Sequence, residues 1–531
     1  MSNVKNYTPY WPKIVIFWGA GTTQPLNIKT TSELGQIFQT LAEHNKNLRA
    51  AIDQTLPEAE EQVRRELDAL LKLINFEDPD GEQTASEVLG IPKARAHHLQ
   101  MLYDWNAVKL AIERCPRNSE HHFSLDDLFN LLDLHIHAHQ GIEVGNRFIT
   151  LDRLIAARRT LLMLTQLIHA VGYQKLLHDQ KLRLRYRQYH QFTSILAERM
   201  HEEGLSRAAK GISLDDRAFY LFSYAVVSMN WDPLLLWLIF NSNKEQNAAA
   251  AAEKIGKYGE PMKLFNDLAH FIAVRQVDGA TPAAWFPMNE TAVQQLNDLR
   301  YPTGRRVRIG KFYFPHGCHG FRRCPKCGKL TFYLGDEWRI DSSYLFPPQI
   351  LPSLSQQKPR SREEKKALEA GIFDAVQCTY CGTITETHHT AIAMQSQLKP
   401  EQPSFIQEIQ NDMRVAIEHA RHIIFAGYSL PDDDFIDRIM LSARRKMDGE
   451  QVKCSIINFD PHATEGWMYG QALHAFCSAH PNASLASTCS RVAAIFGEEN
   501  IRGYGAGFPQ VFLKNGRADR QKVAEMLRVW E

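Results

Sequence analysis

Two pairs of cysteines are the residues of this sequence with the clearest chemistry. Cys324 and Cys327 lie in CPKCG, and Cys378 and Cys381 lie in CTYCG. Four thiolates at this spacing match tetrahedral zinc, and each C-x-x-C-G turn matches the knuckle of a zinc ribbon. We expect a structural zinc ion, because four cysteines leave no coordination position open; free buried thiols are the alternative. Residues 328–377 exceed the usual spacing of a ribbon, so part of them must loop out.

A second group of polar residues directly follows an apolar run. Asn230 and Asp232 come after the strand-like stretch 218–228 and before the apolar sequence PLLLWLIF. An asparagine can bind a ribose hydroxyl or hold a water molecule, and an aspartate can accept a hydrogen bond from a carboxamide. The alternative is that both side chains only cap the next helix in an Asx turn.

The sequence GAGTT follows the first apolar stretch of the chain, residues 13–18. Its glycines allow backbone N–H groups to approach an anion closely, and its two hydroxyls add donors, so the turn suits a phosphate. It is not the full G-x-G-x-x-G pattern, and many such turns hold no ligand. The residues concerned are Gly19, Ala20, Gly21, Thr22 and Thr23.

One histidine stands at the end of a further strand-like stretch. His316 precedes a glycine in FPHG, after residues 306–313. A neutral imidazole in this place can take a proton from a hydroxyl near pH 7. A hydrogen-bonded structural histidine is the alternative.

The strands that must position these residues share one design. Their apolar residues run without alternation, as in a parallel sheet that is covered on both faces. Such a doubly wound α/β sheet binds ligands outside the carboxyl ends of its strands, so we expect the polar strand ends to converge on one crevice. The four stretches that end in Gly, Asn, Asp or Ser cover residues 13–18, 218–228, 422–426 and 453–457.

Much of the remaining chain has helical periodicity. Residues 45–200 are expected to be mostly helical and include a long amphipathic helix that begins at residue 151. Residues 241–300 are also expected to be helical, with a five-alanine run as a good helix former. The sequence KLRLRYRQYH, residues 181–190, is interpreted as a helix with a charged face rather than as a nucleic-acid surface. A terminal helix is expected to close the chain.

The composition is that of a soluble protein with more than one core. The chain has 531 residues, 44% of them hydrophobic and 23% charged, and a net charge of +1. The length predicts two or three domains, and the charge gives no field that points to nucleic acid or membrane. We expect no signal peptide and no membrane-spanning stretch. Because C-x-x-C pairs favour a reducing compartment, we expect a cytoplasmic protein.

Taken in order, these motifs resemble those of the sirtuin family. The order is a Gly-Ala-Gly turn, N-x-D after a strand, H-G after a strand, two C-x-x-C pairs, G-x-S and a second N-x-D. The acidic continuation GYSLPDDDF and the long helical stretch are more similar to the divergent sirtuin-like proteins of bacterial defence systems. The resemblance implies a Rossmann-like parallel sheet with a zinc-ribbon module and a large α-helical insertion.

The resemblance also implies a binding site for NAD. Asn230 then contacts the nicotinamide ribose and helps catalysis, and His316 is the general base. Asp232 holds the carboxamide. Sirtuins continue the glycine turn as GIPDFR, whereas this chain continues as QPLNIKTTSEL, with no matching Phe or Arg. The NAD-binding residues implied are Gly19, Ala20, Gly21, Thr22, Thr23, Asp232, Gly427, Ser429 and Asn458.

The function implied is that of an NAD+ glycohydrolase that depletes NAD during antiphage defence by abortive infection. The alternatives are an NAD-dependent protein deacylase and a non-catalytic sensor of NAD or ADP-ribose. A homo-oligomer built through the helical insertion is expected, as is a partner defence protein such as a DNA-translocating ATPase. Direct binding to nucleic acid or membrane is not expected.

Five segments are predicted along the chain. The sirtuin-like domain begins with its first strand and glycine turn, is interrupted by the helical insertion, continues, is interrupted again by the zinc-ribbon module, and is then completed with a C-terminal helix. In this order the segments are residues 1–44, 45–215, 216–315, 316–390 and 391–531.

Overall fold

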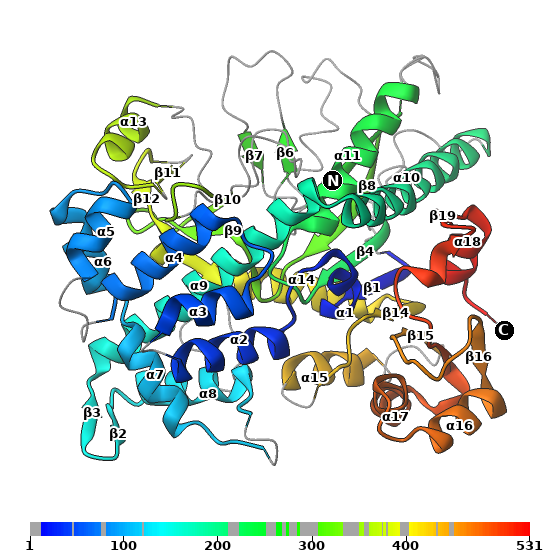
Figure 1. The fold of residues 1–531 in the computed structure, drawn as a ribbon. Helices are drawn as coiled ribbons and strands as arrows, with labels where there is room; N and C mark the ends of the chain where they lie inside the picture. The colour runs from blue at the N-terminus through cyan, green and yellow to red at the C-terminus, as the bar shows by residue number, and fades with distance from the viewer. Residues whose placement is uncertain are drawn as a thin grey trace, which may run out of the picture.

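The fold is known from a computed structural model of the chain. It describes residues 12–44, 47–75, 81–118, 122–210, 222–250, 262–267, 272–274, 284–286, 306–332, 350–354, 361–373, 375–378, 381–392, 403–431, 434–444 and 451–530. Within these residues the chain forms an α/β structure in which helices lie on both sides of a mostly parallel sheet (Figure 1).

The central sheet has ten strands in the described part of the chain, in the order β16-β17-β15-β14-β1-β4-β8-β5-β6-β7. The seven strands from β17 to β5 are parallel, and β16, β6 and β7 are antiparallel additions at the two edges. The strands are β1 (Ile14–Trp18), β4 (Phe222–Ser228), β5 (Met262–Asp267), β6 (Ile272–Val274), β7 (Ala284–Phe286), β8 (Arg306–Tyr313), β14 (His422–Ala426), β15 (Lys453–Ile457), β16 (Trp467–Tyr469) and β17 (Ile501–Tyr504).

The chain changes direction across the sheet at β1. From β1 it passes to β4, β5 and β8 on one side, and it later returns to β14, β15 and β17 on the other. Trp18 at the end of β1 is in register with Ser228 of β4 and with Ala426 of β14. The carboxyl ends of these three strands therefore meet at the point where parallel α/β sheets bind their ligands.

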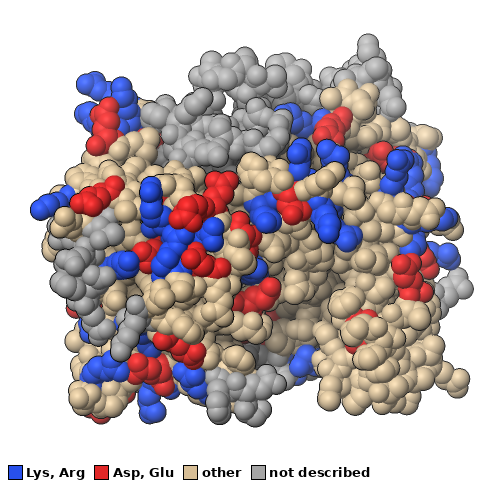
Figure 2. Space-filling view, in the orientation of Figure 1, with Lys and Arg blue, Asp and Glu red and all other residues tan. Residues whose placement is uncertain are grey.

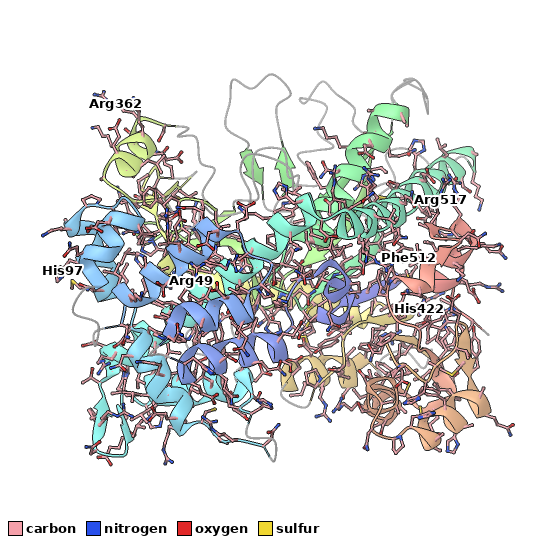
Figure 3. The ribbon with its side chains drawn as sticks, viewed as in Figure 1. Arg49, His97, Arg362, His422, Phe512 and Arg517 are labelled. Atoms are coloured by element: carbon pink, nitrogen blue, oxygen red, sulfur yellow. The ribbon has the colours of Figure 1, made fainter. Side chains whose placement is uncertain are left out.

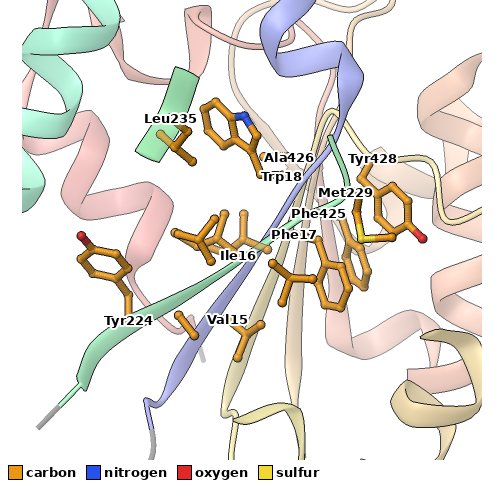
Figure 4. Packing of buried hydrophobic residues seen from close by; sticks show 14 of the residues in the cluster. Val15, Ile16, Phe17, Trp18, Tyr224, Met229, Leu235, Phe425, Ala426 and Tyr428 are labelled. Atoms are coloured by element: carbon orange, nitrogen blue, oxygen red, sulfur yellow. The ribbon is translucent and has the colours of Figure 1, made fainter. Parts of the chain in front are cut away.

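Strand β1 is buried on both faces, as its unbroken apolar sequence predicts. Figure 4 shows its residues pointing alternately to opposite sides of the sheet. Phe17 stacks on Phe425 with ring centroids 5.3 Å apart, whereas Trp18 on the other face meets the edge of Tyr189 and of Phe508. Both faces of the sheet are thus covered by aromatic packing.

Helices occupy most of the chain between β1 and β4. Except for the last of them, which packs in the core around the sheet, they enclose a second hydrophobic core that also includes Trp231, Leu351 and Ile392. The elements are α2 (Thr31–Glu43), α3 (Leu48–Thr55), α4 (Glu61–Leu73), α5 (Gly81–Val88), α6 (Lys93–Leu102), α7 (Trp105–Arg114), α8 (Leu125–His137), α9 (Leu151–His178) and α10 (Gln180–Ala209), with a hairpin of β2 (Ile142–Val144) and β3 (Arg147–Ile149).

Helix α9 is not amphipathic, so this part of the sequence prediction is wrong. Residues 160–173 are buried on every side, because α6, α7, α8 and α10 all pack against the helix. By length and composition α9 is apolar enough to cross a membrane, but 78% of its most apolar window is buried inside the protein. The helix is thus part of the core of the fold described here.

The helical prediction for residues 241–300 is also wrong in part. Helix α11 (Leu234–Ala249) ends near the alanine run, but β5 is a strand that pairs in parallel with β8. The side chain of Asn247 fixes this strand through two hydrogen bonds with the backbone of Leu264, of 2.7 and 2.9 Å. Pairing with a distant strand therefore decides the conformation here. The rest of the predicted stretch lies largely outside the described residues.

The C-terminal segment ends in α18 (Arg520–Leu527), as expected, and packs on the sheet and on α10. His422 of β14 lies 3.2 Å from the carbonyl oxygen of Leu527, and the ring of Phe512 stacks on Phe192 of α10. Figure 3 labels His422 and Phe512 in this region. The guanidinium of Arg502, buried in β17, donates to the carbonyl oxygen of Met526 over 3.0 Å. The last helix is thus part of the main core.

Candidate functional site

A pocket of about 290 Å³ opens outside the carboxyl ends of β1, β4 and β14. Its size is near the lower end of the range that is typical of small-molecule sites. Seven of the predicted site residues line it: Gly19, Ala20, Thr23, Asn230, Asp232, Gly427 and Ser429. Residues that are far apart in the sequence are therefore gathered at the place predicted from the strand ends.

The two glycine turns beside the pocket are packed against each other. A Cβ atom on Gly19 would lie 2.4 Å from the carbonyl oxygen of Gly427, and one on Gly427 would lie 2.4 Å from the nitrogen of Thr22. Gly427 also has φ +56°, a conformation that favours glycine. The N–H groups of Gly19 and Gly21 donate to Ala426 and Gly427 over 2.9 and 3.0 Å. The glycines therefore have a packing role, whether or not the turn binds phosphate.

Thr22 and Thr23 of this turn have different surroundings. The hydroxyl of Thr22 is fully buried and donates to the carbonyl oxygen of Gly19 over 2.6 Å, so it does not face the pocket. Its own carbonyl accepts the hydroxyl of Tyr189. The hydroxyl of Thr23 lines the pocket and accepts the side-chain amide of Asn230 over 3.2 Å.

Asn230 and Asp232 follow β4 and enter the pocket together. The carboxylate of Asp232 accepts the N–H of Leu234 over 3.1 Å, at the start of α11, which is the Asx turn named as the alternative. Burial raises the pKa of Asp232 to about 6, and hydrogen bonds from Leu234, Thr23 and Asn230 oppose this rise. The carboxylate both caps the next helix and presents a largely ionised acceptor to the pocket at neutral pH.

His316 does not line this pocket. It follows β8 at the same edge of the sheet, is 1% exposed, and lies with Asp434 and Asp437 in a cluster whose potential ligand atoms are all within 4.8 Å of one another. Asp434 accepts a hydrogen bond from the hydroxyl of Tyr428, which does line the pocket. The predicted base is therefore connected to the pocket through Tyr428 and Asp434.

Asn458 and Ser429 also have structural partners. The side-chain amide of Asn458 donates to the hydroxyl of Thr488 over 2.9 Å, which ties the end of β15 to α17 (Ser484–Phe496). Asn458 does not line the pocket. Ser429 does, and its carbonyl oxygen accepts the guanidinium of Arg491 over 3.1 Å.

The pocket also contains residues that the sequence did not single out. Lys29 lines it and lies in QPLNIKTTSEL, the segment that departs from the sirtuin pattern. His169 of α9 lines it and lies 3.1 Å from the carbonyl oxygen of Lys29 and 2.8 Å from His319 of β9 (Gly317–Arg323). Burial lowers the pKa of His169 to about 4, so its ring is neutral. Only the departure from the family pattern could have drawn attention to Lys29; no sequence signal marks His169.

The four cysteines form one cluster, as predicted. Cys324 Sγ lies 3.5 Å from Cys381 Sγ, and Cys327 Sγ lies 3.8 Å from Cys378 Sγ. Sulfur atoms bound at about 2.3 Å around a tetrahedral zinc ion are about 3.8 Å apart, so the donors and their spacing fit zinc. Burial raises the pKa of Cys324 to about 12, whereas hydrogen bonds with Thr383 lower the pKa of Cys381 to about 6.

The two cysteine turns have the same backbone geometry. The N–H of Cys324 donates to Lys329 and the N–H of Cys378 donates to Thr383, over 2.9 and 2.8 Å. Each turn contains a glycine with positive φ, +70° at Gly328 and +73° at Gly382. The turns are carried by β9, β10 (Leu330–Phe332), β11 (Val376–Gln377), β12 (Ile384–Thr385) and β13 (Thr390–Ile392). Much of the segment between the pairs lies outside the described residues.

Charges of both signs are interspersed over the face shown in Figure 2. In the basic stretch 181–190, Tyr189 is buried and bonded to the glycine turn, and Gln188 donates to the carbonyl oxygen of Gly516 over 2.8 Å. These side chains therefore serve the core. This agrees with the interpretation of the stretch as a helix with one charged face.

The sequence matches no protein-family model and no curated protein. The candidate site is thus defined by its own geometry.

Proposed function

We propose that this chain is a sirtuin-like NAD+ glycohydrolase of a bacterial antiphage defence system. The observation that carries the proposal is the joint placement of Asn230, Asp232 and the two glycine turns in one pocket at the switch point of the sheet. A Rossmann-like sheet that holds NAD at this point would use these residues as the sirtuin pattern does. The helical segment and the zinc ribbon are the insertions in this proposal.

The proposed reaction converts NAD+ and water into nicotinamide, ADP-ribose and a proton. The bond between the nicotinamide nitrogen and ribose C1′ breaks, and its electron pair leaves with nicotinamide. Water then forms the new bond to C1′ and loses a proton. Asn230 would position the ribose or the water, and Asp232 would accept a hydrogen bond from the carboxamide. Fixed dipoles that favour the developing charge supply much of the rate in such sites.

The experiment is to incubate the purified protein with NAD+ and to follow free nicotinamide by chromatography. Release without an acyl acceptor, lost in Asn230→Ala, would support the hydrolase. Release that requires an acyl-lysine peptide would support the deacylase instead. Binding of NAD without any release would support a sensor. The sensor has one observation in its favour, because His316 does not line the pocket of Asn230.

Regulation by assembly follows from this proposal, since a permanently active enzyme would deplete the NAD of its own cell. The helical segment carries exposed large hydrophobic side chains that could meet a second copy or a partner, namely Met101, Leu134, Phe148 and Leu184. Light scattering of the purified protein, alone and with a candidate defence ATPase, measures this assembly. A monomer with full activity would contradict it.

A further inference from the structure

We propose that His316, Asp434 and Asp437 form a second metal site, which binds a divalent transition-metal ion such as Mn²⁺. This site is separate from the four cysteines, and the proposal does not depend on the cleavage of NAD. His316 comes from the turn after β8, Asp434 directly precedes α15 (Phe435–Arg444), and Asp437 lies in the first turn of that helix. Two distant segments therefore bring three potential ligands together.

The geometry of the cluster is that of a metal site. One nitrogen or oxygen atom from each of the three side chains lies within 4.8 Å of the others, the same limit that the four sulfur atoms of the cysteine cluster meet. All three residues are 5% exposed or less. Two carboxylates this close repel each other strongly when they are removed from water, and a divalent cation between them offsets this repulsion.

The ligand types indicate which ion fits. An imidazole nitrogen suits first-row transition metals, whereas carboxylate oxygens suit harder ions such as Mn²⁺. Three protein ligands leave coordination positions open, unlike the closed set of four thiolates. The site can thus accept a further oxygen ligand from water or from a bound molecule.

The surroundings hold the carboxylates in place. Tyr428 donates its hydroxyl to Asp434, and the N–H of Asp434 donates to the carbonyl oxygen of Pro431 over 3.2 Å. Such hydrogen bonds to ligating carboxylates orient them toward a metal ion. Because Tyr428 also lines the pocket beside Asn230, an ion at this site would be linked to the pocket through one side chain.

An alternative explanation for the aspartates is helix capping. Asp434 directly precedes α15, and its carbonyl oxygen accepts the N–H of Arg438 over 3.1 Å. Capping alone explains acidic residues at the start of the helix. It does not explain why a buried imidazole from another strand end lies against both carboxylates, and a metal ion does.

The test is a titration of the full chain with Mn²⁺, followed by the loss of the free-ion signal in electron paramagnetic resonance. The protein is first dialysed against a chelator, and its residual zinc is counted. We expect one Mn²⁺ per chain, with affinity at least tenfold lower in His316→Gln and in Asp437→Asn. Asp519→Asn is the matched control, because Asp519 caps α18 through the N–H of Lys522 and belongs to no such cluster in the described part of the chain. It should bind Mn²⁺ like the unchanged protein.

Two results would overturn the proposal. The first is that the unchanged protein binds no Mn²⁺ or Zn²⁺ beyond the zinc of the cysteine cluster. The second is that folded His316→Gln and Asp437→Asn proteins bind Mn²⁺ as tightly as Asp519→Asn does. Asn230→Ala should retain the ion, so a failure of the NAD proposal is distinguished from a failure of this one.

Discussion

The side-chain amide of Asn230 donates to the hydroxyl of Thr23 over 3.2 Å, which joins the end of β4 to the turn after β1. The two residues are far apart in the sequence, and each follows a strand whose end faces the same pocket. The bond fixes the orientation of the amide. Its oxygen is then directed by the protein before any ligand arrives, which is the kind of preorganisation that enzyme sites require.

If the proposed function is right, Asn230→Ala should abolish most NAD cleavage and leave the fold intact. Loss of one positioned dipole costs about 10²–10³ in turnover in comparable sites. Nicotinamide release at saturating NAD measures the effect. Asn241→Ala is the control, because the side-chain amide of Asn241 also donates a hydrogen bond, to the carbonyl oxygen of Trp237 over 2.8 Å, within α11. Equal turnover in the two variants would remove Asn230 from the mechanism.

Gly427→Ala should destabilise the protein by about 3 kcal/mol or more. A left-handed non-glycine residue costs roughly 1–2 kcal/mol, and overpacking adds a further ~1–3 kcal/mol. Gly145→Ala separates the two effects, because Gly145 has φ +59° but no atom within 4 Å of an added Cβ. Gly145→Ala should therefore lower the free energy of unfolding only by the cost of the left-handed backbone. Urea denaturation measures both, and similar losses would show that the contact of the two turns is unimportant.

Asp232→Asn should stabilise the protein at pH 7 but not at pH 4. The pKa of Asp232 is raised by burial from 3.8 to about 6 in the folded state, so the folded protein favours the protonated carboxyl. The protonated Asp232 carboxyl makes its full contribution to the free energy of unfolding below pH 3.8. This contribution is lost as the pH rises through 6, and the loss amounts to about 3 kcal/mol at most. Asparagine avoids this cost.

Urea denaturation of the unchanged protein and of Asp232→Asn at pH 7 and at pH 4 measures whether the variant is stabilised only at the higher pH. A stabilisation that is independent of pH would show that Asp232 ionises normally. The same variant should lower NAD cleavage under the proposed function, since a neutral amide oxygen accepts a weaker hydrogen bond from the carboxamide than a carboxylate does. Greater stability with lower activity is the joint result expected.

Cys381→Ser should release the zinc ion. The unchanged protein is expected to hold one zinc per chain at the cysteine cluster, and the variant to hold less and to unfold more easily, because metal binding contributes directly to folding. Atomic emission counts the metal. Cys477→Ser, a change at a half-buried cysteine outside the cluster, should keep the zinc. Equal zinc in both variants would show that the four thiolates do not bind it.

The sequence predicted the structure best where the conformation of a segment depends on the residues of that segment alone. The apolar stretches before GAGTT, MNWD and AGYS became β1, β4 and β14, because unbroken apolar runs fit a sheet that is buried on both faces. Their polar ends could be assigned to one edge from the strand direction alone. The clustering of the two cysteine turns was equally clear from the sequence, since their spacing is typical of cysteines that bind a single ion.

Prediction was weaker where a residue depends on distant neighbours. Strand β17 contains Arg502, whose charge would predict a surface position. Its guanidinium instead packs on Trp467 and on Trp530, with the central carbon 3.9 and 4.5 Å from the two ring centroids. The positions of His316 and His169 relative to Asn230 depend on how separate segments pack. No local pattern contains that information.

The pairing of β1 with β14 has a consequence for the synthesis of the protein. Ile14 is in register with His422, so the first strand must wait for most of the chain before its neighbour exists. At the usual speed of translation this delay is roughly 20–80 s. The pocket needs both strands, because Gly19 and Gly427, which directly follow them, both line it and pack against each other. Under the proposed function, a nascent chain that still lacks β14 would therefore be unable to cleave NAD.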